Sequence, residues 1–161
     1  MPTEAANEAI TERELSLTRI ISATPDKLFR AWTDPALIVK WFTPEPWKTV
    51  RAEIDPRPGG SSCIVMRSPE GQEYPNNGVY LEVVKNKKLV FTDAFVRAWE
   101  PSNKPFMVGT ITLEDLGGAK TRYTARVQHW TIADRMAHEE MGFHPGWGKA
   151  TDQLEALVAT L

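Results

Sequence analysis

A small set of side chains in this sequence could carry acid–base or hydrogen-bonding chemistry, and His129 leads the set. His129 stands at the end of an alternating run in which Tyr123, Ala125 and Val127 share one face. An imidazole at that place could act as a general base or as a hydrogen-bond partner near neutral pH. The alternative is a structural histidine that ties the end of a strand to the following helix. The sequence leaves both interpretations open.

Asp93 is the second candidate, because it lies among apolar residues. It shares the parity of Leu89, Phe91 and Phe95 in a strand-like run. Asp93 is therefore either a cavity carboxylate or a residue at a twist or bulge where the alternation slips.

Arg19 raises the same question on another predicted strand. It shares the parity of Leu15 and Leu17, which predicts an inward-facing guanidinium. A buried charge needs a partner, and Asp93 or Glu140 could serve as its counter-ion. The alternative is a guanidinium on the solvent face of the strand.

The segment from His138 to His144 raises the question of a metal site. A zincin-like helix would need a second histidine four residues after His138, where the sequence has Gly142. The chain has three histidines and one cysteine, and we expect neither a metal nor a cofactor. One of Glu139 and Glu140 should face inward before the helix break, with surface charge and a capping contact as the alternative.

The aromatic residues indicate where a cavity could have walls. Three of the six tryptophans fall on predicted helix faces, where we expect core packing: Trp32, Trp41 and Trp147. The other three fall near loops or strand ends and could line a cavity mouth: Trp47, Trp99 and Trp130. The segment 95–106 around Trp99 contains prolines and charges and is a candidate lid or interface loop.

The predicted ligand-binding set joins the polar candidates to apolar residues on the same faces. Its charged or titratable members are Arg19, Asp93, His129 and Glu140, of which the last three are also the catalytic candidates. Its apolar and aromatic members are Phe91, Phe95, Trp99, Tyr123, Val127, Met136, Phe143 and Trp147. Such a set suits a cavity with mostly apolar walls and a few polar groups that hydrogen-bond to a ligand.

A long C-terminal helical segment, from Thr131 to Leu161, must position part of this set. It is punctuated once, between Gly142 and Pro145. Beyond Pro145, apolar residues recur at spacings of 3, 4, 3 and 4 and share one helix face: Trp147, Ala150, Leu154, Leu157 and Leu161. A single apolar stripe needs one partner surface, and a curved antiparallel sheet that grips this helix would supply it.

About seven short strands and two short helices precede that segment. Helix starts are predicted where an oxygen-bearing cap precedes a proline, at Thr24-Pro25 and at Asp34-Pro35. Alternation predicts strands near 15–21, 50–54, 61–66, 79–84, 89–95, 106–114 and 121–129. We expect a flexible tail over residues 1–12 and a single domain over 13–161, of the α+β class.

Composition excludes several classes of protein. Hydrophobic residues make up 42% of the chain and the net charge is -2, which is typical of a globular domain and gives no support for nucleic-acid binding. The single cysteine, Cys63, cannot form an intrachain disulfide. No signal peptide or membrane-spanning run is predicted, so we expect a cytoplasmic protein without a membrane partner.

Several motifs in a fixed order resemble the START-like (SRPBCC) superfamily. They are Thr24–Pro35, Trp41-Phe42 with Pro44, Asp55–Gly60, Gly78-Val79-Tyr80 and Gly146-Trp147. Within that superfamily they are most similar to the branch named after the activator of the heat-shock chaperone ATPase. The resemblance implies a helix-grip fold, in which a seven-stranded sheet wraps the C-terminal helix and two short helices follow the first strand. It also implies a cavity between the sheet and the helix.

The resemblance leaves three classes of function open. Members of the superfamily bind lipids, sterols, hormones or polyketides, and our leading hypothesis is a small hydrophobic or aromatic ligand between sheet and helix. The enzyme alternative is a cofactor-independent cyclase, hydrolase or isomerase, with His129 as base and Asp93 or Glu140 orienting it. The third is an interaction module, homodimeric or bound to a chaperone, which predicts a filled core and an exposed apolar patch.

Overall fold

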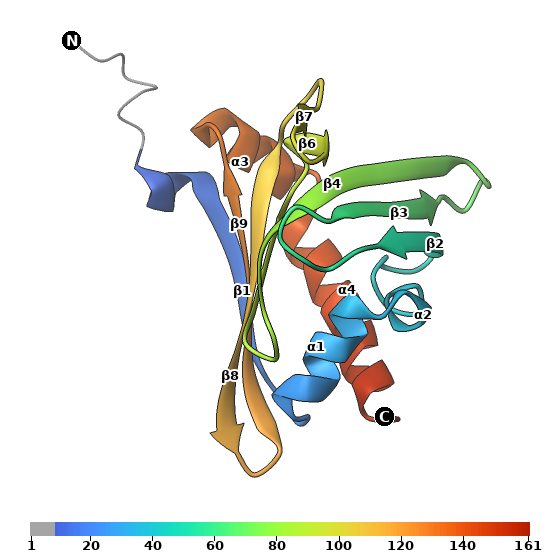
Figure 1. The fold of residues 1–161 in the computed structure, drawn as a ribbon, viewed down its shortest axis with the longest axis vertical. Coiled ribbons are helices and arrows are strands. Elements are labelled where there is room, and N and C mark those ends of the chain that lie inside the picture. Colours follow the sequence, from blue (N-terminus) through green and yellow to red (C-terminus); the bar gives the residue numbers. More distant parts are fainter. Residues whose placement is uncertain (1–8) are drawn as a thin grey trace.

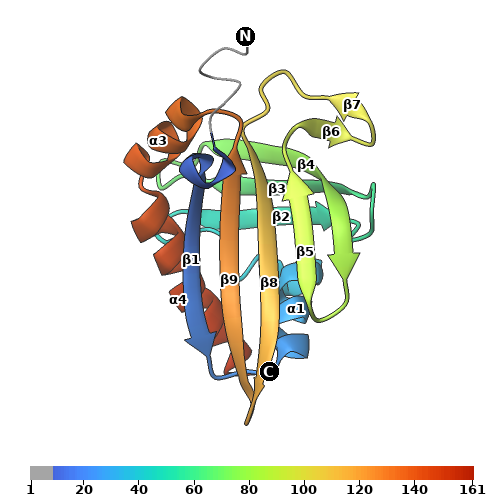
Figure 2. The same cartoon turned by 90° about the vertical axis from the view of Figure 1, so that its left-hand side faces the viewer.

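One long C-terminal helix lies against the inner face of a bent sheet. The computed structural model describes residues 9–161. Figure 1 shows β1, β9 and β8 running nearly upright and β2 and β3 running across, with α4 between the two groups. Figure 2, turned by 90°, shows the upright strands side by side with β5. The predicted helix-grip fold of the α+β class is therefore confirmed.

Within the described residues, seven strands form the main antiparallel sheet, in the order β1-β9-β8-β5-β4-β3-β2. Their bounds are β1 Glu14–Ile21, β2 Lys48–Ile54, β3 Ser61–Arg67, β4 Glu73–Val84, β5 Lys88–Thr92, β8 Met107–Gly117 and β9 Lys120–His129. Two further strands, β6 Phe95–Arg97 and β7 Glu100–Pro101, form a small ribbon within the segment predicted as a lid or interface loop.

The helices follow the predicted pattern of starts. α1 spans Pro25–Thr33 and α2 spans Pro35–Ile38, each with proline in its first turn. The Asp34 carboxylate caps α2 by accepting from the Ala36 N–H at 2.9 Å. Two helices follow β9: α3 Ile132–Glu140 and α4 Phe143–Val158. Within residues 9–161, no helix is long and apolar enough to cross a membrane.

The segment predicted as a flexible tail, residues 1–12, lies mostly outside the described part of the chain. Its described end belongs to a short 3-10 helix, η2, over Ile10–Arg13. This helix leads directly into β1.

The predicted alternation of β9 is confirmed. Tyr123, Ala125, Val127 and His129 are all buried. The register with β8 brings three apolar or small residues opposite them: Leu113 against Tyr123, Ile111 against Ala125 and Gly109 against Val127. These cross-strand pairs lie next to one another on the inner face of the sheet.

The C-terminal helix begins earlier than its apolar spacing indicated. Gly142 adopts φ of 99° between α3 and α4, and α4 starts at Phe143, so Pro145 lies inside its first turn. The first backbone N–H groups of a helix have no acceptor within the helix, so proline is tolerated there. From the predicted stripe, Ala150 and Leu154 are buried. The remaining members, Trp147, Leu157 and Leu161, pack against the same core.

Strand β4 begins earlier than the strand predicted near 79–84, because Asn76-Asn77-Gly78 also belongs to it. Its first half, up to Val79, pairs with β3, whereas its second half pairs with β5. Among the described residues, the part of β4 before Val79 pairs with β3 alone and has no strand on its other edge. Pro75, which has no backbone N–H, therefore leaves no hydrogen bond unmade on that other edge. At this point the sheet opens into its two groups of strands.

Gly78 is required where β5 leaves β4. A Cβ atom added at Gly78 would collide with the backbone carbonyl oxygen of Thr92. Backbone cannot give way as a flexible side chain can.

We expect Gly78→Ala to lower the free energy of unfolding by about 2 kcal/mol or more, because strands must separate to relieve the clash. The control is Gly146→Ala in α4, where an added Cβ meets nothing within 4 Å. That variant should be neutral or gain up to about 1 kcal/mol from helix propensity. Urea unfolding of both variants checks the prediction, and equal stabilities would contradict it.

Candidate functional site

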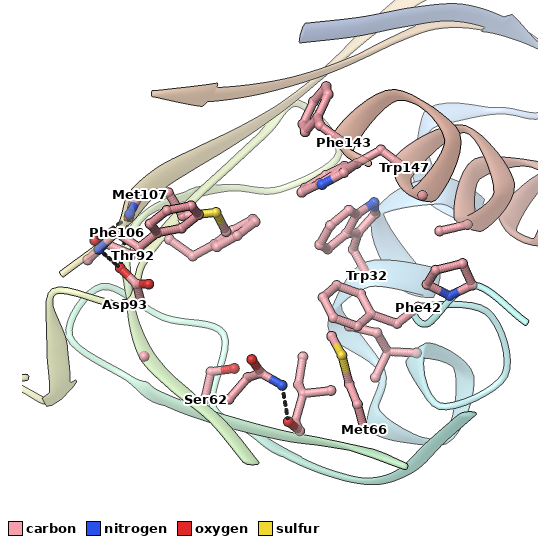
Figure 3. Close-up of a pocket in the computed structure, with 18 of the residues that line it drawn as sticks. Trp32, Phe42, Ser62, Met66, Thr92, Asp93, Phe106, Met107, Phe143 and Trp147 are labelled. Atoms are coloured by element: carbon pink, nitrogen blue, oxygen red, sulfur yellow. Dashed lines mark hydrogen bonds between the residues drawn. The ribbon is translucent and has the colours of Figure 1, made fainter. Parts of the chain in front are cut away.

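A cavity of about 530 Å³ lies between the inner face of the sheet and α4. Residues of α1 and of the α2 region close it on one side, and the start of β8 and the end of α3 close it on another. Figure 3 shows the labelled side chains arranged around an open centre. The volume falls in the range of sites that hold small molecules.

Aromatic rings dominate the walls. The aromatic residues that line the cavity, apart from two tyrosines, are Trp32, Trp41, Phe42, Phe91, Phe106, Phe143 and Trp147. Trp32 joins several of them, with its ring centroid 4.9 Å from that of Trp41 and 5.7 Å from that of Phe42. Its indole N–H also donates to the Tyr123 hydroxyl at 3.2 Å. Edge-to-face contacts and this hydrogen bond hold the wall in place without a ligand.

Small residues on α4 leave the space empty. Gly146 and Ala150 line the cavity four residues apart on one face of α4, and Gly142 lines it just before the helix begins. A Cβ atom added at Gly146 meets nothing within 4 Å. At Gly146 and Ala150, α4 therefore extends almost no side-chain volume into the cavity.

Gly109 on β8 also lacks a side chain, but there a neighbouring aromatic ring fills the space. Gly109 lies opposite Phe91 in the β5–β8 register, and a Cβ added there would lie 2.6 Å from the Phe91 ring. The ring thus packs directly over the backbone of β8. This packing places Phe91 in the wall of the cavity.

Asp93 lies immediately after β5 and faces the cavity. Its Oδ1 accepts from the backbone N–H groups of Phe106 at 2.9 Å and Met107 at 3.1 Å. The neighbouring Thr92 hydroxyl donates to the Met107 carbonyl at 2.8 Å and accepts from Ala94 N–H at 3.1 Å. These bonds tie the end of β5 to the start of β8. Asp93 thus stands just beyond the end of β5 and also lines the cavity.

Two buried tyrosines add neutral polar groups. Burial raises the pKa of Tyr80 to about 12, against the opposing effect of a hydrogen bond with Ser62. Burial also raises the pKa of Tyr123, although the Trp32 indole donates to its oxygen. The Tyr123 hydroxyl has no acceptor for its proton among the described residues. Both phenols are protonated at neutral pH and can donate to a ligand.

His129 does not line the cavity but supports a residue that does. It is 2% exposed, its Nδ1 lies 2.7 Å from the Arg13 carbonyl oxygen, and its Nε2 lies 2.9 Å from His138 Nδ1. A carbonyl only accepts, so Nδ1 of His129 carries a proton. In the neutral pair, His129 Nε2 then accepts from His138 Nδ1–H, which leaves Nε2 of His138 unprotonated. This assignment follows from the hydrogen-bond pattern.

His138 is the imidazole that lines the cavity. Its ring packs between those of Phe106 and Phe143, at centroid distances of 5.0 and 5.2 Å. Burial, with a smaller contribution from His129, lowers the pKa of His138 to about 4. Its ring is therefore neutral at pH 7. Among residues 9–161, no three His, Cys, Asp or Glu side chains gather in a way that could hold a metal ion.

Five residues of the predicted ligand-binding set line the cavity: Phe91, Asp93, Tyr123, Phe143 and Trp147. Seven lie elsewhere: Arg19, Phe95, Trp99, Val127, Met136, Glu140 and His129. Val127 is buried beside Leu15 and Phe143 in a small cluster of its own. Met136 and Glu140 are exposed on α3. Trp99 is 60% exposed and stacks edge-to-face on Phe95 in the β6–β7 ribbon.

Arg19, whose orientation the sequence left open, lies part-buried against α4 and meets other partners than those expected. Its Nη1 lies 2.6 Å from the Asp152 carboxylate, and its Nη2 donates to the Gly148 carbonyl at 3.0 Å. The counter-ion is therefore on α4, and the expected pairing with Asp93 or Glu140 is not found. Arg19 fixes β1 to the helix that it faces.

Sequence reasoning missed several residues of the site. Trp32 and Trp41 were assigned to core packing and do belong to the main core, but they also line the cavity. His138, which was considered only as a metal ligand, lines it too. Two signals could have found more of the site. Ser62, Ile64 and Met66 share one strand parity and all face the cavity. The spacing of four between small residues on the gripped helix marked the empty face.

The family of the protein follows from comparison with known proteins. A family model described as "Activator of Hsp90 ATPase homolog 1-like protein" matches residues 22–159. The chain belongs to this family. The resemblance seen in the sequence motifs is thereby confirmed, and the comparison with curated proteins finds no match.

Solved structures agree with membership of the Activator of Hsp90 ATPase homolog 1-like family. A protein from Nitrosomonas europaea is 41% identical, with a TM-score of 0.89 over 92% of this chain and 96% of its own. A protein from Rhodobacter sphaeroides is 23% identical, with a TM-score of 0.80 over 93% and 95% of the two chains. One from Mycobacterium smegmatis is also 23% identical, with a TM-score of 0.75 over 96% and 95%. The last two share the fold.

The buried state of His138 predicts a pH-dependent stability. Its pKa is about 4 in the folded chain and 6.5 ordinarily, so the unfolded chain binds more protons between these values. The free energy of unfolding should therefore fall as the pH drops from about 6.5 to about 4. Because the ring is only half-buried, we expect its share to be roughly 1–2 kcal/mol.

Urea unfolding of His138→Gln against the parent chain, at several pH values, measures that share. The variant keeps a donor for His129 but cannot titrate. As the pH drops from about 6.5 to about 4, the free energy of unfolding should fall by roughly 1–2 kcal/mol less in His138→Gln than in the parent. A parallel decline for parent and His138→Gln would show that His138 titrates normally in the folded state.

Proposed function

We propose that the protein binds a small hydrophobic or aromatic molecule in the cavity between the sheet and α4. The observation that carries this proposal is the cavity itself, about 530 Å³ with walls built mainly of aromatic rings. Protein interiors are normally packed without such voids. A space of this size, lined by rings that hold one another in place, is a feature that a ligand would explain.

The energetics favour an apolar ligand. Removing apolar surface from water contributes about 25 cal/mol per Å², and aromatic contacts add to that. The wall around Trp32 is already held by Trp41, Phe42 and the Tyr123 hydroxyl, so little ordering is left for the binding step. A preorganised site loses less free energy on binding than a flexible one.

Two alternatives find less support. The enzyme hypothesis needs His129 to meet Asp93 or Glu140, but its two ring nitrogens meet the Arg13 carbonyl and His138. The interaction-module hypothesis predicts a filled core. The cavity differs from that expectation and favours ligand binding. A homodimer, a chaperone partner and a cytoplasmic location stay predictions.

Filling the cavity tests the proposal. Gly146→Leu places a side chain on the empty face of α4, where an added Cβ meets no atom within 4 Å. We expect the variant to fold and to bind 2-naphthylmethanol at least about tenfold more weakly than the parent, because the ligand and the new side chain compete for the same space. Isothermal titration calorimetry measures both affinities.

The matched control is Ala156→Leu, which adds leucine to the exposed face of the same helix. It should bind like the parent. If the parent binds none of 2-naphthylmethanol, 2-methylnaphthalene and 2-naphthylmethylamine, or if Gly146→Leu binds as well as Ala156→Leu, the cavity is not the binding site.

A further inference from the structure

The described lining of the cavity carries one formal charge at neutral pH, and that charge is negative. Among the described residues that line it, Asp93 is the only one with a formal charge at neutral pH, and none is lysine or arginine. The remaining titratable groups are neutral there, because burial raises the pKa of Tyr80 and lowers that of His138. A ligand in this space therefore meets one negative charge and no positive one.

The Asp93 carboxylate has a fixed orientation, and one of its two oxygens is left to accept from a ligand. Among residues 9–161, only Oδ1 accepts hydrogen bonds, from the Phe106 and Met107 backbone. Figure 3 shows the carboxylate turned toward the open centre, with its second oxygen directed into it. Backbone N–H groups orient the carboxylate without neutralising it, so its charge remains available to a bound group.

A second acceptor stands near the same end of the cavity. Asp93 Oδ1 binds the backbone of Phe106, and the ring of Phe106 packs on that of His138. In the neutral histidine pair, His138 keeps an unprotonated Nε2, because its Nδ1–H is donated to His129. Phe106 is thus flanked by two groups that accept hydrogen bonds.

We propose that the ligand carries a protonated amine that pairs with Asp93, on a hydrophobic or aromatic skeleton that occupies the ring-lined part of the cavity. This inference rests on the proposed ligand-binding function and specifies the class of ligand. An ammonium supplies several donors to acceptors at this end and forms charge-assisted hydrogen bonds with a carboxylate. The faces of nearby rings also attract cations. An anionic ligand would meet uncompensated repulsion in a poorly hydrated site.

Three ligands with one skeleton separate charge from shape. They are 2-naphthylmethylamine, 2-naphthylmethanol and 2-naphthoic acid, each titrated calorimetrically into the full-length protein at pH 7. We expect the amine to bind at least about tenfold more tightly than the alcohol, and the acid to bind more weakly than the alcohol. Equal affinities of amine and alcohol, or a preference for the acid, would overturn the inference.

The variant Asp93→Asn tests whether the preference for the amine over the alcohol depends on this carboxylate. Asparagine keeps an Oδ1 that can accept from the Phe106 and Met107 backbone, so the fold should be retained, which thermal unfolding checks. The variant should bind amine and alcohol with affinities within about twofold of each other. Asp115→Asn is the matched control, because Asp115 also accepts a backbone N–H, that of Gly117 at 2.9 Å, in the exposed β8–β9 turn. It should keep the parent's preference, and an unchanged preference in Asp93→Asn would overturn the assignment.

The two proposals fail in different ways. If the alcohol binds and Gly146→Leu weakens it while the amine has no advantage, the ligand site stands and the amine inference is wrong. If neither these three ligands nor 2-methylnaphthalene binds the parent, the proposed function itself is wrong, and the amine inference falls with it.

Discussion

The packing of α4 against the sheet is the interaction on which the rest of the structure depends. Toward the C-terminus of the helix, Leu154 and Val158 are almost fully buried and join the main core. Toward its N-terminus, Gly146 and Ala150 present little volume to the sheet. The same helix is therefore anchored at one end and leaves space at the other. Because the anchored end fixes the distance between helix and sheet, the space is not closed by a simple collapse.

A second constraint acts where the sheet divides. Gly78 allows the Thr92 carbonyl to approach β4 closely, and the residue after Thr92 is Asp93. Asp93 then binds the first backbone N–H groups at the start of β8. The bend that opens the sheet thus also places Asp93, the one carboxylate among the described residues of the cavity wall. The fold positions this charge through backbone contacts, and the described lining contains no lysine or arginine.

Much of the framework could be predicted from local patterns in the sequence. The Thr24-Pro25 and Asp34-Pro35 signals located α1 and α2, and strand parity found the buried face of β9. Parity, however, cannot separate a residue that lines a cavity from one that fills a core, since both point inward. Tyr123 and Val127 have the same parity, yet only Tyr123 lines the cavity.

The missed features depend on contacts between distant segments. The partners of Arg19 are on α4, 129 and 133 residues away, and His129 meets Arg13 across the β1–β9 end of the sheet. No local spacing encodes these pairs. The extension of β4 through Asn76 and Asn77 was missed because turn-forming residues outweighed a pairing that only β3 supplies.

The methionines offer the most direct measurement of whether the cavity takes a ligand. Met66, Met107 and Met141 line it, whereas Met136 is exposed on α3 outside the lining. Protein labelled with ¹³C at the methionine methyl groups can be titrated with 2-naphthylmethanol and followed by NMR. A ligand in the cavity should shift the Met66 and Met107 methyl signals, give contacts between these methyls and the naphthalene ring, and leave Met136 unchanged. Shifts confined to Met136, or contacts absent from Met66 and Met107 at saturation, would contradict the account.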